Sequence, residues 1–257
     1  PNGVYAYYAS IDSITGEPYL HNLDIDLTKS NHYVLGYDFY ISDNIRFKTE
    51  AYYQQLYNIP VEVKPSSFSS VNQGSGFARY FPNELENTGI GTNYGVEVTI
   101  EKFFSKHYFF MITGSLYEST YYGSDGVKHN TDFNGNYALN VLGGTEFKVG
   151  KKSSLGIGTK VTLAGGKRYG DVDSVRSELA KEVIFLDKGY NEKQFKNYFR
   201  ADLKISYKIN AKKITHEIAL DIVNFFDTQN LLTITYAPKP GSDAPPFRES
   251  PQLGRLP

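Results

Sequence analysis

Residues 44–57 read NIRFKTEAYYQQLY, and this stretch shows most clearly which secondary structure the chain forms. One parity of the stretch is largely apolar and carries Ile45, Phe47, Thr49, Ala51, Tyr53 and Tyr57. The other parity is polar and carries Arg46, Lys48, Glu50, Tyr52 and Gln54. Side chains alternate between the two faces of a β-strand, so a period of two predicts a strand with one apolar and one charged face.

The same alternation recurs along the chain, in residues 33–41, 94–100, 137–149, 155–163, 199–209 and 218–222. Residues 108–117 are also apolar, but there both parities are apolar and the sequence does not say which faces which way. The expected strands run for about 10 to 14 residues, whereas strands of soluble domains usually have about 5 or 6. A tilted strand needs about 9 to 11 residues to cross a bilayer, so the lengths favour a membrane barrel.

Short and long connections alternate between these strands. Tight turns are expected at 42–44, 105–106, 150–153 and 210–213, and long connections at 58–92, 119–135 and 165–196. Short periplasmic turns and long external loops are typical of an outer-membrane barrel. The alternation therefore places Asp43 and Lys151 on the periplasmic side and Tyr121 and Arg168 outside.

A membrane sheet must close into a barrel, because hydrocarbon cannot satisfy unpaired backbone groups. We therefore predict an all-β, antiparallel up-and-down meander that forms part of a transmembrane β-barrel, with residues 1–257 as one unit. The charged parity then faces the lumen, since an Arg or Lys on the lipid side at midplane costs about 2–4 kcal/mol. The expected lumen-facing residues are Arg46, Lys48, Glu50, Glu97, Glu146, Lys160, Arg200, Asp202, Lys204, Glu217 and Asp221.

The composition agrees with this interpretation and excludes several other classes of protein. The chain has 22 Tyr and 17 Phe, and the amphipathic Tyr ring suits a membrane–water boundary. The net charge of −1 gives no reason to expect a nucleic-acid partner. The absence of Cys excludes disulfides, a zinc–thiolate site and a thiol nucleophile within this chain. The first residues carry no signal-like segment, so an exported protein would have this chain as a fragment or a processed product.

No arrangement of residues predicts catalysis, a metal site or a cofactor. The five His residues have no metal-ligand spacing, and Asp171 with Asp173 is expected to be a solvated acidic pair. The glycine-rich segment 89–95 precedes a strand and opens no helix, unlike a phosphate-binding loop. We expect no enzyme, although a barrel-embedded hydrolase with a Ser–His pair on neighbouring strands stays open as an alternative.

Several segments together resemble the late barrel strands of TonB-dependent receptors. They are GYDFY (36–40), IRFKTEAYY (45–53), NYGVEVTIEK (93–102), FNGNY (133–137), GGKRY (165–169), YFRADLK (198–204) and LDIVNFFD (220–227). The resemblance covers about residues 23–257 and implies about eight or nine of the 22 strands of such a barrel. It also implies a plug domain and a TonB-contacting segment, neither of which is present here, and a last strand ending in an aromatic residue, which is missing.

The resemblance implies TonB-energised uptake of a nutrient across the outer membrane of a Gram-negative bacterium. The expected partners are outer-membrane lipid, TonB, the plug domain and an extracellular nutrient, which could be an iron chelate, a glycan, a peptide or cobalamin. Aromatic rings stack on sugars or chelator rings, and Arg grips carboxylates or catecholates. The expected ligand contacts in the external loops are Arg79, Tyr80, Tyr121, Tyr122, Arg168, Tyr169 and Asp171. An outer-membrane adhesin or structural barrel and a soluble Tyr-rich β-sheet binding module stay open as alternatives.

Overall fold

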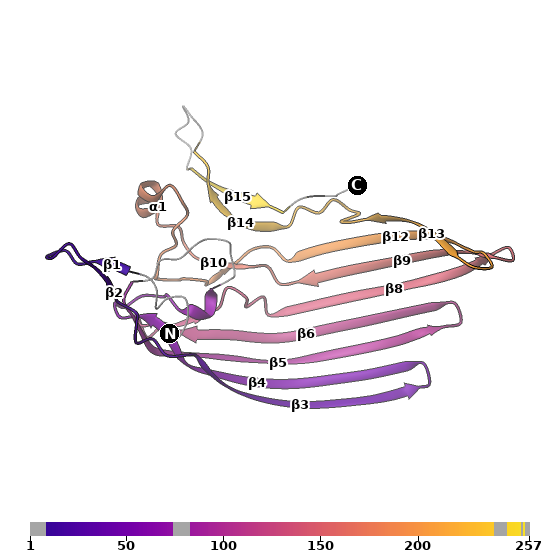
Figure 1. Ribbon diagram of the computed structural model, residues 1–257, viewed down its shortest axis with the longest axis horizontal. Coiled ribbons are helices and arrows are strands. Elements are labelled where there is room, and N and C mark those ends of the chain that lie inside the picture. Colours follow the sequence, from indigo (N-terminus) through magenta and orange to yellow (C-terminus); the bar gives the residue numbers. More distant parts are fainter. Residues whose placement is uncertain (1–8, 74–82, 239–245, 253, 255–257) are drawn as a thin grey trace.

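The computed structural model describes residues 9–73, 83–238, 246–252 and 254, and its main feature is a nine-stranded antiparallel sheet (Figure 1). The path through the sheet is β13-β12-β9-β8-β6-β5-β4-β3, and the short strand β7 pairs with β6 beside this path. The strands are β3 (Lys29–Ser42), β4 (Ile45–Glu62), β5 (Leu85–Ser105), β6 (Tyr108–Tyr122), β7 (Lys128–Asn130), β8 (Tyr137–Val149), β9 (Ser153–Ala164), β12 (Tyr198–Asn210) and β13 (Thr215–Ile222). The path ends at β3 and β13, so the predicted all-β, up-and-down meander is confirmed as an open sheet.

Within the described residues, three small two-stranded sheets and two short helices accompany the main sheet. The hairpins are β1 (Ala9–Ile11) with β2 (Pro18–Leu20), β10 (Arg168–Tyr169) with β11 (Lys193–Gln194), and β14 (Leu231–Tyr236) with β15 (Phe247–Pro251). The helices are α1 (Ser174–Ala180) and the 3-10 turn η2 (Ser70–Asn72). Among the described residues, no helix is both long and apolar enough to cross a membrane.

The connections separate by length, as the sequence predicts. Every tight turn, at 43–44, 106–107, 150–152 and 211–214, lies at one end of the sheet, at the right of Figure 1, and the long loops lie at the other. These are the first long loop (63–84), the second (123–136) and the third (165–197). The first is shorter than the predicted 58–92, because β4 and β5 stay paired past Leu56 through two register shifts.

The strand register decides which residues share a face, because directly paired residues of antiparallel strands point to the same side. Glu50 pairs with Glu97, and Lys160 pairs with Asp202. Lys204 pairs with Asp221 on the far side of β12. Followed from strand to strand, the pairs place all the charged residues predicted for the lumen on one face, which we call the charged face.

The register also settles β6, whose two parities are both apolar in sequence. Ile112 pairs with Ile100 on β5 and with Val141 on β8, so it belongs to the opposite, apolar face. Its neighbour Thr113 pairs with Thr99 and Asn140 and therefore belongs to the charged face. Pairing with strands distant in sequence therefore shows which residues of β6 lie on each face, which hydrophobic periodicity could not show.

The apolar face has little protein to pack against. Leu35, Leu116 and Ile218 are 79%, 70% and 72% exposed. Among the described residues, Ala201 is a buried hydrophobic residue of the apolar face, paired with Val161. The other buried hydrophobic residues are Ile25, Ile59, Val61, Leu85, Tyr121 and Phe195. Contiguous exposed apolar surface of this kind marks contact with a membrane or another protein.

Aromatic side chains mark two levels on this apolar face. Tyr33, Tyr53 and Tyr94 pair with one another across three strands toward the loop end. Phe39 and Phe47 pair nearer the turn end, with ring centroids 5.3 Å apart. Six residues separate the two levels on β3 and on β4, which is about 20 Å along a strand. Aromatic rows at two depths with aliphatic residues between them are typical of a strand that crosses a bilayer.

Lys102 is an exception on the apolar face, since it pairs with Ile45 and Phe110 but carries a charge. It is 6% exposed, and its ammonium group folds into the tight turn between β5 and β6. Nζ donates to the carbonyl oxygens of Phe103, Ser105 and Tyr108 at 3.0–3.3 Å and to the Ser105 hydroxyl at 2.8 Å. It also lies 3.9 Å from the centre of the Tyr108 ring. The Lys102 ammonium group therefore finds its hydrogen-bond acceptors within the turn.

Candidate ligand-binding surface at the loop end

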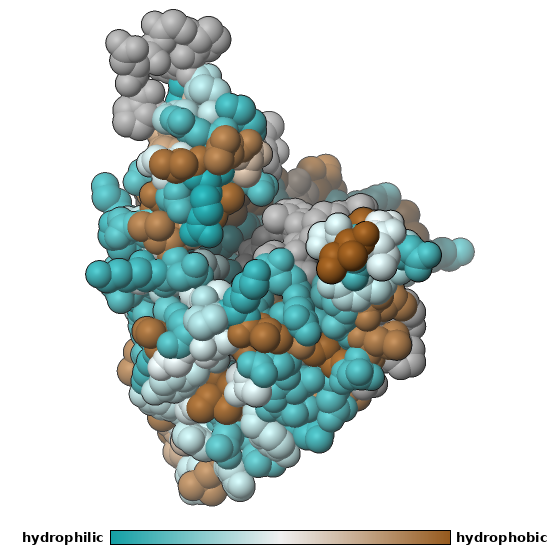
Figure 2. All heavy atoms as spheres, turned by 90° about the vertical axis from the view of Figure 1, so that its left-hand side faces the viewer, coloured by the Kyte–Doolittle hydropathy of each residue, from teal (hydrophilic) through white to brown (hydrophobic). Residues whose placement is uncertain are grey.

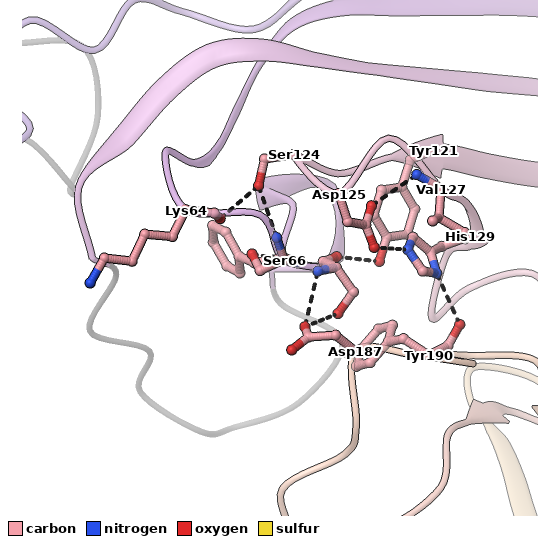
Figure 3. A network of polar contacts seen from close by, with 11 residues as sticks. Lys64, Ser66, Tyr121, Ser124, Asp125, Val127, His129, Asp187 and Tyr190 are labelled. Atoms are coloured by element: carbon pink, nitrogen blue, oxygen red, sulfur yellow. Dashed lines mark hydrogen bonds and ion pairs between the residues drawn. The ribbon is translucent and has the colours of Figure 1, made fainter.

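The three long loops contact one another at the loop end of the sheet (Figure 3). Seen from this end, the surface is largely hydrophilic, with separate hydrophobic patches (Figure 2). A surface built on loops over a rigid sheet is the usual place for ligand recognition. The contacts between the loops therefore decide which side chains a ligand could reach.

Tyr121 joins the sheet to the first long loop. It lies near the end of β6, on the charged face, and is 0% exposed. Its hydroxyl donates a hydrogen bond of 2.7 Å to the carbonyl oxygen of Ser67. A buried Tyr hydroxyl needs such a partner, and this one holds the first loop over the end of the sheet.

His129 joins the second loop to the third. Its side chain is 2% exposed, its Nε2 lies 2.8 Å from Oδ2 of Asp125, and its Nδ1 lies 3.4 Å from the carbonyl oxygen of Tyr190. Asp125 also accepts a 3.0 Å hydrogen bond from the backbone N–H of Val127, which orders the turn before β7. Figure 3 shows Asp125, His129 and Tyr190 in line across this contact.

Asp187 joins the third loop to the first. Its Oδ1 accepts hydrogen bonds from the backbone N–H of Ser67 at 3.0 Å and from the Ser67 hydroxyl at 2.8 Å. Ser124 of the second loop donates to the carbonyl oxygen of Lys64 at 2.9 Å, which adds a further link to the first loop. The three loops thus form one connected unit rather than three independent ones.

Asparagine side chains hold segments at the loop end in place. Their amides form hydrogen bonds with backbone N–H and C=O groups, as the backbone of a neighbouring strand would. Asn22 donates to the carbonyl oxygen of Asn83 at 3.0 Å and accepts from the N–H of Leu85 at 2.7 Å. Asn230 makes the same pair of contacts with the backbone N–H and C=O of Phe199, both at 2.9 Å. Asn191 donates to the carbonyl oxygen of Asn130 at 3.1 Å. These amides satisfy backbone groups that would otherwise be unpaired where the regular sheet ends.

Several residues predicted to contact a ligand have partners within the protein. Arg168 donates to the carbonyl oxygen of Asn134 and to Oδ1 of Asn136. The ring of Tyr169 stacks on Phe195 with centroids 4.2 Å apart, and Asp171 forms an exposed ion pair with Lys193. Tyr121 has no exposed surface, whereas Tyr122 is 39% exposed. Arg79 and Tyr80 lie outside the described residues, and ligand contact by any residue of this set stays a prediction.

A hollow of about 560 Å³ lies between the first and third loops and was not predicted from the sequence. Its lining includes Ser67, Phe68, Phe185, Asp187 and Tyr190. Burial raises the pKa of the Tyr190 phenol, and the nearby Asp132 and Asp187 act in the same direction, so its hydroxyl keeps its proton. No local pattern in the sequence indicates this hollow, because its walls come from segments more than 100 residues apart.

Neither a metal site nor a catalytic group emerges from the parts of the chain that the structure describes. Within residues 9–73, 83–238, 246–252 and 254, no group of three or more His, Cys, Asp or Glu side chains is arranged to hold a metal ion. His129 and Asp125 form a close pair, but both ring nitrogens of His129 lie against acceptors within the loops. The surface can therefore bind a molecule through polar and aromatic contacts.

Asp187→Ala is expected to release the first loop from the third. Both Ser67 donors lose a carboxylate acceptor, and hydrogen bonds to charged groups contribute about 1.5–3 kcal/mol. Amide hydrogen exchange at Ser67 should therefore become about ten times faster or more. Asp171→Ala removes only an exposed ion pair and serves as the control. Equal exchange at Ser67 in both variants would show that Asp187 does not hold the first loop.

Comparison with solved structures gives a fold-level match. The ferric yersiniabactin uptake receptor FyuA from Yersinia pestis matches 89% of this chain with a TM-score of 0.57 and 16% identity. The ferric-catecholate import receptor Fiu from K12 E. coli matches 99% of it with a TM-score of 0.55 and 14% identity. No protein-family model and no curated protein sequence matches the chain.

The match covers only part of those receptors, because the chain spans 28% of the length of either one. At this level of identity the likeness concerns the fold and not the ligand. The predicted resemblance is confirmed at that level: the chain has the fold of part of the β-barrel of TonB-dependent outer-membrane receptors.

Proposed function

We propose that the chain forms barrel wall and external loops of an outer-membrane receptor that imports a nutrient with energy delivered by TonB. The observation that carries the proposal is the segregation of charge, since every charged residue predicted for the lumen lies on one face of long strands. An apolar face with aromatic rows at two depths suits lipid, and the charged face suits an enclosed aqueous interior.

The charged face supplies a polar wall with both signs of charge. Lys48 lies 2.7 Å from Glu50, and Arg200 lies 2.7 Å from Asp202. Lys208 lies 3.9 Å from both Glu146 and Glu217. Pairs of this kind leave little net field of one sign, so the wall suits contact with a protein plug better than selection of ions by charge. The plug and the TonB-contacting segment are expected in the portion of the receptor outside the matched 28%.

For the nutrient we propose an iron chelate. The support comes from the two structural neighbours, whose names describe uptake of ferric yersiniabactin and of a ferric catecholate. The chain itself supplies linked external loops and a hollow between them, which is suitable for a molecule of moderate size. No arrangement of described side chains suggests that the chain changes its ligand chemically, so we propose a binding and transport role without catalysis.

The experiment uses the full-length receptor in a Gram-negative host that lacks its own ferric-chelate receptors. We expect the receptor in the outer-membrane fraction and accumulation of labelled iron from a supplied ferric trihydroxamate. Deletion of TonB should reduce this accumulation at least tenfold and leave the amount of receptor unchanged. Uptake that is independent of TonB, or a receptor found in the aqueous fraction, would contradict the proposal. An adhesin would reach the outer membrane but show no uptake.

A further inference from the structure

Lysines are concentrated in the tight turns at one end of the sheet, at the right of Figure 1. Three of the four turns, 106–107, 150–152 and 211–214, carry lysine, whereas the turn at 43–44 carries a carboxylate. The three basic turns belong to neighbouring hairpins, so their tips are about 10 Å apart, which is two strand spacings. We call these residues the turn lysines, and they are Lys106, Lys151, Lys152, Lys212 and Lys213.

The turn lysines have no ionic partner in the part of the chain that the structure describes. Each is exposed, and none forms an ion pair with a described residue. Other lysines near this end are satisfied within the protein. Lys208 lies 3.9 Å from Glu146 and from Glu217, and Lys102 donates to acceptors within its own turn. The turn lysines are therefore accessible to a partner outside the protein.

One of the basic turns has an unfavourable backbone conformation for the residues that it carries. Ser105 pairs with Tyr108, so Lys106 and His107 form a two-residue turn, and their φ angles are 52° and 75°. Asn-Gly is the usual pair in a turn with two positive φ angles, because few other side chains adopt them easily. The geometry of the turn therefore does not explain why it contains a lysine.

The apolar face continues as far as these turns and places them at its boundary. Phe147 and Tyr207 share one row of that face, because both pair with Leu155, and they are 51% and 37% exposed. Val149, the last residue of β8, is 44% exposed, and Lys151 follows two residues later. Exposed aromatic residues followed by lysine are typical of a strand that leaves hydrocarbon for the lipid headgroups. Short turns keep the lysines close to that boundary.

We propose that the turn lysines bind the phosphate groups of anionic phospholipids in the leaflet at the turn end, which the loop pattern predicts to be periplasmic. The inference rests on the proposed function, since it requires the sheet to lie in a membrane. The charges are complementary, and lysine is a common phosphate ligand. A negatively charged lipid surface attracts lysines that lie within about 10 Å of it. Anionic lipid therefore accumulates beside these hairpins at the turn end.

The absence of Cys from this chain permits a fluorescent probe at one chosen position. In the full-length protein, with any Cys elsewhere replaced, Val149→Cys carries bimane on the apolar face at the turn end, and Ile90→Cys carries it at the loop end. Each protein is placed in phosphatidylcholine vesicles that contain a small fraction of nitroxide-labelled phosphatidylglycerol or nitroxide-labelled phosphatidylcholine. The ratio of quenching by the anionic lipid to quenching by the zwitterionic lipid measures local enrichment. We expect this ratio to be at least about twofold higher at Val149→Cys. Equal ratios overturn the proposal.

Substitution by Gln shows whether the turn lysines cause the enrichment. Replacing all five should lower the quenching ratio at Val149→Cys to the value at Ile90→Cys. High salt should lower it too, because salt screens exposed charges. The control variant removes the same charge from the loop end by replacing five exposed lysines with Gln, namely Lys64, Lys167, Lys181, Lys188 and Lys196. The control should leave the ratio at Val149→Cys unchanged. A ratio that survives the loss of the turn lysines overturns their role.

The measurements separate this inference from the proposed function. Outer-membrane location and TonB-dependent uptake, combined with equal quenching ratios, would overturn only the binding of anionic lipid. Equal ratios together with binding of a polyglutamate peptide that requires the turn lysines would indicate an acidic protein partner instead. A protein that stays in the aqueous fraction would contradict the proposed function itself. The two ideas therefore fail on different measurements.

Discussion

Val96→Arg is expected to lower the free energy of unfolding of the full-length protein in lipid vesicles by about 2–4 kcal/mol. Val96 lies on the apolar face of β5 between the two aromatic levels, and both of its strand partners, Ala51 and Leu116, are apolar. A guanidinium there has hydrocarbon around it and no carboxylate opposite. The change corresponds to about 30- to 1000-fold in the folding equilibrium, measured by denaturant titration of the reconstituted protein.

Ser115→Arg is the matched control, because it adds the same side chain at nearly the same level of the neighbouring strand. Ser115 lies on the charged face between Glu97 and Ala138, where an aqueous interior can hydrate the new charge. We expect a change of less than about 1 kcal/mol at this position, as is usual for surface substitutions. Equal destabilisation by the two variants, or a larger effect at Ser115, would show that the apolar face does not contact lipid.

Lys102→Met is expected to destabilise the receptor by about 2–4 kcal/mol, although Met is more apolar than Lys. The substitution removes a donor shared by three carbonyl oxygens and the Ser105 hydroxyl. Unsatisfied buried acceptors cost about 1–3 kcal/mol each, and the losses do not add fully. The same titration measures the effect, and the turn between β5 and β6 should show faster hydrogen exchange.

Lys106→Met provides the comparison for Lys102, because it removes an ammonium from the same turn. Lys106 is exposed and has a positive φ of 52° that Met would also have to adopt, so backbone strain is unchanged. We expect little effect on stability. If Lys102→Met were as harmless as Lys106→Met, the ammonium would contribute nothing to the turn.

The sheet could be predicted from the sequence because its determinants are local. In β4, apolar residues such as Phe47 alternate with charged residues such as Lys48. Neighbouring side chains of a strand point to opposite sides, so this alternation predicts both the strand and the residues on each of its faces. In β6 that signal fails, because Phe109, Phe110, Met111 and Ile112 are apolar in succession. The orientation of Ile112 follows from pairing with Ile100 and Val141, which are distant in sequence.

The loop end was less predictable because its contacts are long-range. Residue type alone predicts Tyr121 as a ligand contact, and the structure adds that its hydroxyl bonds to Ser67, 54 residues away, and that the side chain is buried. The hollow depends on the hydrogen bond between Asp187 and Ser67, which are 120 residues apart in the sequence. No residue spacing within either loop predicts this contact. Side-chain chemistry indicates which residue types could contact a ligand. The tertiary structure is needed to tell which of those residues are exposed.

The asparagine amides that hold segments at the loop end have a consequence for the conditions under which this structure is kept. Segments of exported proteins are often held by covalent sulfur bridges, which depend on the oxidising state of their surroundings. Here Asn22, Asn191 and Asn230 hold such segments through amide hydrogen bonds, and this chain contains no thiol to oxidise. The geometry of these segments should therefore be the same in anoxic, sulfide-rich surroundings as in air.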